Sequence, residues 1–165
     1  MRPKDAGAAQ ILDRTLTAYR IGDPAGRYPI FDATGSRLAP GRWNSAQASM
    51  IYAAEHYSTA VLEKLVHGSG YLPPNQHFIR LTIPRGTSYE VFDPAALPGW
   101  DSFPPGVSVE HGTRWCLEAR SLILLVPSVV ARMERNVLIN PAHPEFRLIE
   151  TGLHEPVWWD QRLFR

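Results

Sequence analysis

The sequence predicts an α+β fold, formed as a single compact domain around a bent mixed sheet. Three observations predict it. Many short segments have the apolar patterns of strands, one or two segments have helical spacing, and no internal repeat or low-complexity block divides the chain. A length of 165 residues fits one domain, which we place at residues 1–165 with residues 1–10 as a loose leader.

The first half of the chain predicts one strand and one helix. Residues 11–21 form a short segment that holds Tyr19-Arg20-Ile21, and a loop rich in glycine and proline follows over residues 22–41. Residues 50–53 predict a strand. Residues 57–67 predict a helix, because apolar residues recur there at helical spacing before a glycine.

An alternative stays open for this region. Residues 51–66 could instead form one continuous helix. Tyr52 and Glu63, eleven residues apart, would then lie on nearly the same helix face. In the strand-plus-helix arrangement, only tertiary packing brings them together.

The second half predicts a series of strands. Residues 78–83 alternate between apolar and polar side chains until Pro84, and residues 89–92 form a second candidate strand. Residues 100–112 are loop-like, and residues 113–120 predict a short helix that carries Trp115. The continuous apolar run at residues 122–126 is typical of a strand buried on both faces, and residues 137–139 and 147–149 complete the set.

Composition narrows the class of protein. The net charge of +1 gives no argument for a nucleic-acid or membrane-surface partner. One cysteine, Cys116, excludes an internal disulfide framework and fits a reducing compartment. Because no signal peptide and no run of about 18 apolar residues is visible, we expect a cytoplasmic protein without a membrane span.

Several common sites are not indicated. The sequence has no GxGxxG and no GxxxxGK[ST], so it predicts neither a Rossmann nor a P-loop nucleotide site. Its six histidines show no zinc-binding spacing, and we expect no metal site.

Three segments place polar residues beside apolar runs. In Gly41-Arg42-Trp43-Asn44, a guanidinium beside an indole can hold a phosphate or carboxylate. Glu63 follows three apolar residues on the predicted helix, where a half-buried carboxylate suits the stabilisation of a developing cation. Ser128 follows the predicted buried strand, close to the crevice that its end would border.

Each segment also has an ordinary structural interpretation. Arg42 could extend over a core tryptophan with its charge in water, and Glu63 could face solvent. Ser128 and the nearby asparagines could serve as turn residues. Ser128 lies in no GxSxG sequence, so a serine-hydrolase role is not expected.

Taken in order, these segments resemble the RES domain, a family named for an arginine, a glutamate and a serine. The resemblance covers about residues 17–163. Six pieces carry it: Tyr19-Arg20-Ile21, Gly41-Arg42-Trp43-Asn44, Ile51-Tyr52-Ala53, Ala60-Val61-Leu62-Glu63, residues 121–128 and Asn136-Val137-Leu138-Ile139-Asn140-Pro141-Ala142-His143-Pro144. Two details depart from the family pattern: Pro40 replaces a common glycine, and Gly112-Thr113-Arg114-Trp115 replaces a Gly-Asp-x-Trp element.

The resemblance implies a fold, an activity and a partner. It implies a fold like that of ADP-ribosyltransferases and the role of toxin in a bacterial toxin–antitoxin pair. It implies degradation of NAD, at least in some members by phosphorolysis to ADP-ribose 1″-phosphate and nicotinamide, with inorganic phosphate as co-substrate. The implied partner is an Xre-type antitoxin with a helix-turn-helix domain that blocks the active site.

It also implies roles for particular residues. Cleavage of the nicotinamide–ribose bond builds positive charge on the ribose, which an ionised Glu63 would offset. We expect Arg20 and Arg42 to bind the NAD diphosphate or an attacking phosphate, and Tyr52 to contact the nicotinamide end. Ser128 would donate to a phosphate or ribose oxygen, and Asn140 or His143 would line the rim. No metal is needed.

Other outcomes stay open at this point. The same residues could transfer ADP-ribose to a protein or simply hydrolyse NAD. A non-catalytic module that binds a nucleotide or an acidic peptide is a further alternative, and it would bind NAD without releasing nicotinamide.

Overall fold

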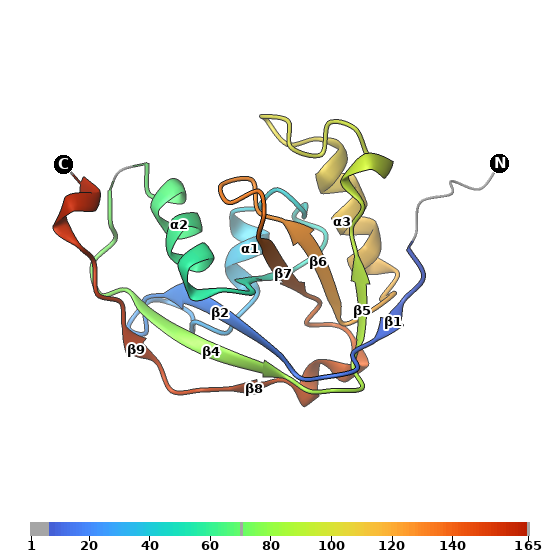
Figure 1. The fold of residues 1–165 in the computed structure, drawn as a ribbon, viewed down its shortest axis with the longest axis horizontal. Helices are drawn as coiled ribbons and strands as arrows, with labels where there is room; N and C mark the ends of the chain where they lie inside the picture. Colours follow the sequence, from blue (N-terminus) through green and yellow to red (C-terminus); the bar gives the residue numbers. More distant parts are fainter. Residues whose placement is uncertain (1–6, 70, 165) are drawn as a thin grey trace.

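A nine-stranded sheet organises the chain, with strand order β1-β5-β6-β7-β3-β2-β4-β8 and with β9 beside β4 (Figure 1). The computed structural model describes residues 7–69 and 71–164. The strands are β1 (Gln10–Ile11), β2 (Leu16–Gly22), β3 (Ile51–Ala54), β4 (His77–Ile83), β5 (Ser88–Val91), β6 (Ile123–Pro127), β7 (Arg135–Ile139), β8 (Glu150–Thr151) and β9 (Glu155–Pro156). The α-helices are α1 (Thr34–Leu38), α2 (Tyr57–His67) and α3 (Val107–Leu117), and short 3₁₀ turns cover Pro94–Ala96, Pro144–Leu148 and Gln161–Phe164.

The sheet bends between β2 and β3, which are joined through a single residue pair, Tyr19 and Ala54. On either side of this junction the pairing is continuous, over seven positions between β2 and β4 and over four between β3 and β7. In Figure 1, β2 and β4 run across the direction of β7 and β6. Since β5 and β6 are parallel and the other pairs antiparallel, the predicted bent mixed sheet of an α+β fold is confirmed.

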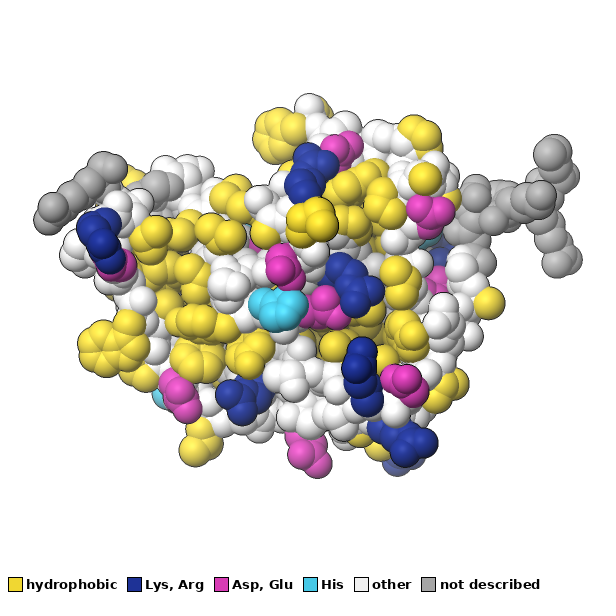
Figure 2. Space-filling view, in the orientation of Figure 1, with side chains coloured by type: hydrophobic (Ala, Val, Ile, Leu, Met, Phe, Trp, Pro, Cys, Tyr) yellow, Lys and Arg dark blue, Asp and Glu magenta, His cyan; other side chains and the backbone are white. Residues whose placement is uncertain are grey.

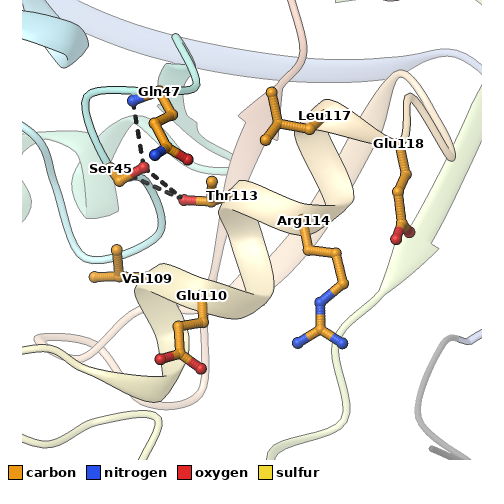
Figure 3. Close-up of a pocket in the computed structure, with 8 residues that line it drawn as sticks. All are labelled: Ser45, Gln47, Val109, Glu110, Thr113, Arg114, Leu117 and Glu118. Carbon is orange, nitrogen blue, oxygen red and sulfur yellow. Dashed lines mark hydrogen bonds between the residues drawn. The ribbon is translucent and has the colours of Figure 1, made fainter.

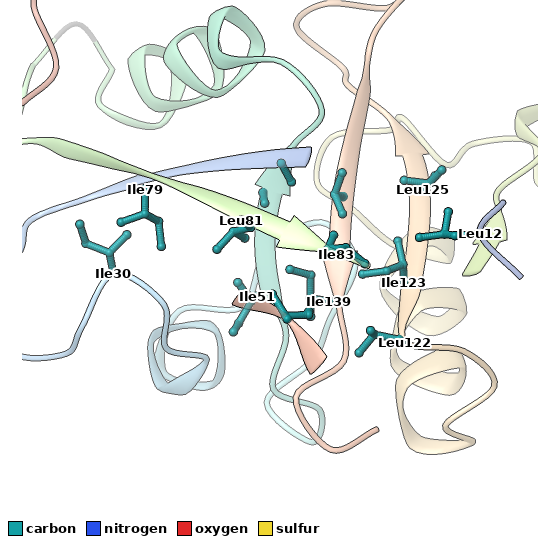
Figure 4. Close-up of a cluster of buried hydrophobic side chains, with 14 residues drawn as sticks. Leu12, Ile30, Ile51, Ile79, Leu81, Ile83, Leu122, Ile123, Leu125 and Ile139 are labelled. Atoms are coloured by element: carbon teal, nitrogen blue, oxygen red, sulfur yellow. The ribbon is translucent and has the colours of Figure 1, made fainter. Parts of the chain in front are cut away.

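The main hydrophobic core lies between the two parts of the bent sheet (Figure 4). The alternation predicted for β4 is confirmed, because Ile79, Leu81 and Ile83 are buried whereas Arg80 is exposed. All residues from Leu122 to Val126 are buried, as their apolar run predicts for a strand covered on both faces.

A second core lies on the opposite face of β6 and β7, where α3 packs. Its largest fully buried member is Trp115, whose indole N–H donates to Ser121 Oγ at 2.9 Å. Trp43 and Trp100 stack in the same cluster, with ring centroids 6.1 Å apart. This core holds the segment around Arg42 against the sheet.

The predicted helix at residues 57–67 is α2, and the strand predicted at residues 50–53 is β3. The single continuous helix considered for residues 51–66 does not form. Glu55 and His56 separate the two elements, and His56 has extended backbone angles. Tyr52 and Glu63 therefore lie on different elements.

Several local predictions were wrong. The loop predicted at residues 100–112 ends early, because α3 begins at Val107, directly after the Pro-Pro-Gly sequence, and the helix predicted at residues 113–120 covers only its last part. Residues 147–149 do not form a strand. Pro144 and the side chain of His143, which caps the backbone N–H of Glu145, instead start a 3₁₀ turn.

The N-terminal third is more regular than predicted. The loop predicted at residues 22–41 contains the five-residue helix α1. Of the predicted loose leader, residues 1–6 lie outside the described residues, whereas Gln10 pairs with Tyr89 at the edge of the sheet.

One face of the molecule is partly apolar. In Figure 2, hydrophobic side chains gather over the region of α2, β2 and β4, and charged groups lie nearer the centre. Tyr57 of α2 makes edge-to-face contacts with Tyr19 and Phe78, at centroid distances of 6.0 and 4.8 Å. Within the described ranges, no helix has the length and apolar character required to span a membrane.

Candidate active site

The carboxylate of Glu63 is the centre of a polar cluster between α2 and the β6–β7 hairpin. Ser128 Oγ and Asn136 Nδ2 both donate to Glu63 Oε1, each at 2.7 Å. Ser128 follows β6 and Asn136 is the second residue of β7, so the antiparallel hairpin brings them together. The Glu63 side chain remains 24% exposed. One carboxylate oxygen is thus held by the protein while the group stays accessible.

The second oxygen of Glu63 has a different environment. Oε2 lies 4.0 Å from His67 Nε2, one helical turn further along α2. Among residues 7–69 and 71–164, no hydrogen bond to Oε2 is present. This oxygen is available to a ligand.

Ser128 supports Glu63 from within the fold. It is fully buried, accepts a hydrogen bond from the backbone N–H of Ala131 at 3.0 Å and donates its own proton to Glu63. From the sequence, Ser128 was predicted to donate to a substrate oxygen. The observed bond uses its one hydroxyl proton on Glu63, so the geometry supports a positioning role.

Arg20 is tied to backbone carbonyls. Its Nε donates to Ile30 O at 2.6 Å and its Nη1 to Tyr52 O at 2.7 Å. Burial lowers the pKa of Arg20, and the nearby Asp32 partly opposes that effect. These bonds occupy part of its fork of five donors, and they connect β2, β3 and the intervening loop. Arg20 therefore fixes the backbone around the site and also contributes a positive charge to it.

The Tyr52 phenol is fixed in a neutral form. Its hydroxyl donates to Asn44 Oδ1 at 2.6 Å and accepts from the Trp43 backbone N–H at 3.1 Å. Burial raises the pKa of Tyr52, more strongly than the Trp43 hydrogen bond and the positive charge of Arg42 lower it. Asn44 is fully buried and also accepts from the Gly41 N–H.

Tyr52 and the Glu63 cluster share one face of the sheet. Tyr52 pairs with Leu138, and Ala54, two residues later, pairs with Asn136. Directly opposed residues and residues two apart project from the same face. The sheet register therefore places the Tyr52 side chain on the side where Asn136 meets Glu63.

Arg42 stands beside Tyr52 and anchors the segment before α3. Its Nη1 donates to Ser102 O at 2.7 Å and to Trp100 O at 3.2 Å. Arg132 reinforces this segment through an ion pair with Asp101 at 2.8 Å. Arg42 does not simply extend over Trp43 into water, since its guanidinium is bound to loop carbonyls, and its Nε and Nη2 make no hydrogen bond within the described chain.

Lys64 is a further cation on α2, and it was not among the residues predicted from the sequence. Burial lowers the pKa of Lys64, and the positive charge of Arg20 lowers it further. Lys64 directly follows Glu63 on α2, and Asp23 partly opposes the lowering of its pKa. The sequence contains one indication of this residue: Lys64 and Glu63 are charged, whereas the residues on either side of them in the helix are apolar.

Asn140 is placed apart from this cluster. It is fully buried at the opposite end of β7, where its Nδ2 donates to Cys116 O at 2.9 Å and its Oδ1 accepts from the Ala142 N–H at 3.0 Å. His143 caps the following 3₁₀ turn. The structure thus brings Glu63, Ser128 and Asn136 together and groups Arg20 and Arg42 around Tyr52, whereas Asn140 and His143 support the fold elsewhere.

Two surface grooves lie outside these residues. One, of about 540 Å³, follows the outer side of α3 and includes Thr113, Arg114 and Leu117 (Figure 3). The other, of about 280 Å³, is bordered by Phe31 and Phe146, which stack with centroids 5.3 Å apart. Neither groove includes Glu63 or Tyr52, so we assign the site by its chemistry: an accessible carboxylate, a neutral phenol and three cations.

The chain is similar to known proteins along most of its length. Residues 17–160 match the RES domain family. A protein of Sphingobium sp. strain YBL2 named Prs ADP-ribosylating toxin is 38% identical over 158 residues, which cover 92% of this chain and 98% of that protein. A protein of Photorhabdus laumondii named Toxin Res is 33% identical, over 79% of this chain and 85% of its own.

The fold is also found in a solved structure. A chain in the crystal structure of the M. tuberculosis MbcT–MbcA toxin–antitoxin complex superposes with a TM-score of 0.67 at 11% identity, covering 89% of this chain and 86% of that chain. This similarity shows a shared fold. Together with the match of the RES domain to residues 17–160 and the identity to curated relatives, it shows that the chain belongs to the RES-domain toxin family.

Proposed function

We propose that this protein is the toxin of a toxin–antitoxin pair and an enzyme that binds NAD and breaks its nicotinamide–ribose bond. The observation that carries the proposal is the carboxylate of Glu63, held through Oε1 by Ser128 and Asn136 with Oε2 left for a ligand. The names of its relatives, Prs ADP-ribosylating toxin and Toxin Res, support the same class of activity.

The chemistry of the reaction accounts for the carboxylate. As the bond between ribose C1″ and the nicotinamide nitrogen breaks, positive charge builds on the ribose ring. An ionised Glu63 offsets that charge and accepts from a ribose hydroxyl through Oε2. Nicotinamide leaves as a neutral base, so the step needs no general acid at the leaving group, and no metal.

The cations of the site would bind the diphosphate of NAD. Arg42 keeps Nε and Nη2 for the NAD diphosphate, and Lys64 adds charge from α2. Arg20 contributes charge while it fixes the backbone of Tyr52. The neutral Tyr52 ring offers a surface for the nicotinamide end.

Inorganic phosphate is the acceptor that we propose first. In that reaction a phosphate oxygen forms a bond to C1″, the C1″–N bond breaks, and the products are ADP-ribose 1″-phosphate and nicotinamide. The cations that bind a diphosphate would also hold a phosphate. A protein side chain is the second candidate acceptor, and the relative named Prs ADP-ribosylating toxin, at 38% identity, favours it.

The partner that we propose is an Xre-type antitoxin that covers this site in the cytoplasm. The fold shared with a chain of the MbcT–MbcA complex supports an antitoxin partner. A stable complex purified after co-expression with the antitoxin, with restored growth and no NAD loss, would support it. Undiminished NAD loss in that complex would contradict it.

The test is nicotinamide release from NAD by the purified protein, in phosphate buffer and in phosphate-free buffer. Release that depends on phosphate, with ADP-ribose 1″-phosphate as product, supports phosphorolysis. Release in either buffer with adenine-labelled ADP-ribose retained on an added protein supports transfer, whereas free ADP-ribose indicates hydrolysis. Binding of NAD by calorimetry without any nicotinamide release would contradict an enzymatic role.

A further inference from the structure

Asn136, on β7, donates to the same oxygen of Glu63 as Ser128, and the chemistry described above uses it only to hold that oxygen. We propose that Asn136 is a positioning residue, which holds the Glu63 carboxylate in one orientation so that Oε2 faces the ribose. This inference rests on the proposed function and adds a specific residue to its site.

The two donors converge on one oxygen. Ser128 Oγ and Asn136 Nδ2 each lie 2.7 Å from Glu63 Oε1. The Ser128 hydroxyl already accepts from the Ala131 N–H, so its single proton is directed to Glu63. The carboxylate is therefore fixed at Oε1 from two directions, and its rotation is restricted.

The orientation of the Asn136 amide depends on that carboxylate. Its Nδ2 faces Glu63, and its Oδ1 is buried without a hydrogen-bond partner in the described structure. An unpaired buried carbonyl is unfavourable, and it persists here because the opposite orientation would set the amide oxygen against the carboxylate oxygen. The amide thus gives up one hydrogen bond in order to donate to Glu63.

The sheet holds Asn136 in place. It is paired on both sides, with Ala54 of β3 and Val126 of β6. A side chain on a central strand has little freedom to follow a moving partner, unlike one on a loop. Asn136 is therefore the rigid member of the pair, and α2 brings Glu63 to it.

Other charged groups surround the pair, and they must be separated from its effect. They are His67 and Lys64 on α2, Glu134 and Arg135 on the hairpin, and the partners of the last two, His56 and Glu55. All of them are unchanged in a variant of Asn136. The ratio of variant turnover to wild-type turnover at each pH therefore reports the effect of the Asn136–Glu63 contact, separately from the titration of these other groups.

The first variant, Asn136→Leu, removes the donor with little change in side-chain volume. We expect kcat for nicotinamide release to fall about 10- to 100-fold, because a small displacement of a reacting group is costly. The KM for NAD should stay within about twofold, since the cations that bind the diphosphate are untouched. Wild-type turnover in Asn136→Leu overturns the inference.

The second variant, Asn136→Asp, keeps the shape and replaces the donor with a carboxyl group. Two carboxylates this close cannot both be ionised easily, so at low pH they share a proton and Asp donates to Glu63. At high pH both ionise and repel. We expect the ratio of variant to wild-type turnover to rise about tenfold or more between pH 8.5 and pH 5.5. A constant ratio overturns the inference.

The chain offers a matched control in Asn75→Asp. Asn75 Nδ2 donates to Asp23 Oδ1 at 2.8 Å on the exposed surface, which is the same amide–carboxylate contact outside the Glu63–Ser128–Asn136 cluster. Its turnover should follow the wild type at every pH. If its ratio also rises at low pH, the effect is general to the fold and the inference fails.

Thermal unfolding extends the test without activity. At pH 8.5, Asn136→Asp should lower Tm, and adding Glu63→Gln should restore most of the loss, because the glutamine amide can donate to Asp. No restoration contradicts the contact. Lack of nicotinamide release by the wild type overturns the proposed function and the catalytic part of this inference, whereas wild-type release with unaffected Asn136→Leu overturns this inference alone.

Discussion

Gly41 lies against the phenol of Tyr52, so closely that a Cβ on Gly41 would come within 2.7 Å of Tyr52 Oη and 2.8 Å of Cζ. The glycine before Arg42 thus leaves space for the Tyr52 hydroxyl to reach Asn44 and the Trp43 N–H. The segment that carries Arg42 and the strand that carries Tyr52 are fitted together at this contact.

Gly41→Ala should destabilise the protein by about 1–3 kcal/mol, the usual cost of forcing an extra carbon into a packed position. The methyl group must displace the phenol, which breaks its hydrogen bonds. Urea denaturation measures the free energy of unfolding, and nicotinamide release should fall in the same variant. Unchanged stability would show that Tyr52 can move aside without cost.

Gly112→Ala should be more damaging, at about 3 kcal/mol or more. A Cβ on Gly112 would lie 2.0 Å from Trp43 O, a backbone atom that cannot rotate away, so α3 would have to leave its place. At a position without such a contact, alanine would stabilise the helix by about 1 kcal/mol relative to glycine. A loss of stability in Gly112→Ala would therefore indicate the clash with Trp43.

The control for Gly112→Ala is Gly35→Ala in α1, where nothing lies within 4 Å of the added Cβ. This control should be neutral or slightly stabilising by urea denaturation. A Gly112→Ala variant as stable as the control would contradict the close packing of α3 on Trp43.

Arg20→Lys should lower the free energy of unfolding by about 1–3 kcal/mol. The guanidinium donates to three backbone carbonyls from three different nitrogens, at 2.6 Å to Ile30, 2.7 Å to Tyr52 and 3.5 Å to Asp32. A single ammonium cannot reproduce that fork. The measurement is urea denaturation together with NAD binding by calorimetry. A variant with wild-type stability and only weakened NAD binding would show that Arg20 acts as a ligand clamp alone.

Glu63→Gln should retain the fold and lose turnover of NAD by about 100-fold or more, since it removes a charge placed at the developing cation. The glutamine oxygen can still accept from Ser128 and Asn136, so thermal unfolding should stay near the wild type. Nicotinamide release at saturating NAD measures the effect. Full activity in this variant would contradict the role of the carboxylate.

Raised pH should destabilise the protein through Cys116. Burial raises the pKa of the Cys116 thiol from 9.0 to about 11. Between these values the thiol of the unfolded chain ionises while the thiol of the folded chain does not, so stability present below pH 9 is lost as pH rises toward 11.

Cys116→Ala should lose less stability than the wild type between pH 7.5 and pH 10.5, which urea denaturation at both values measures. Tyr52 is present in both proteins, and its pKa is raised mainly by burial, with a smaller contribution from Cys116. Equal losses in the two proteins would contradict the contribution of Cys116.

The sequence by itself determined the elements whose patterns are local. The alternation of β4, the apolar run of β6 and the helical spacing of α2 each depend on a few neighbouring residues, and all three formed as predicted. The bent mixed sheet followed from the number of short strands. The local pattern did not predict the start of α3, because Gly112 and the preceding Pro-Pro-Gly are unfavourable for a helix. The helix forms there because Gly112 packs closely on Trp43.

Only the tertiary structure decided what the polar residues contact. Whether Glu63 faces solvent or partners depends on a hairpin 65 to 73 residues further along the chain. The same applies to Arg20, which is bound to the Tyr52 carbonyl, and to Asn140, which is buried just beyond the far end of β7, the strand that holds Asn136. A residue type specifies which hydrogen bonds are possible, but the partners come from sheet register and helix packing, which no short segment encodes.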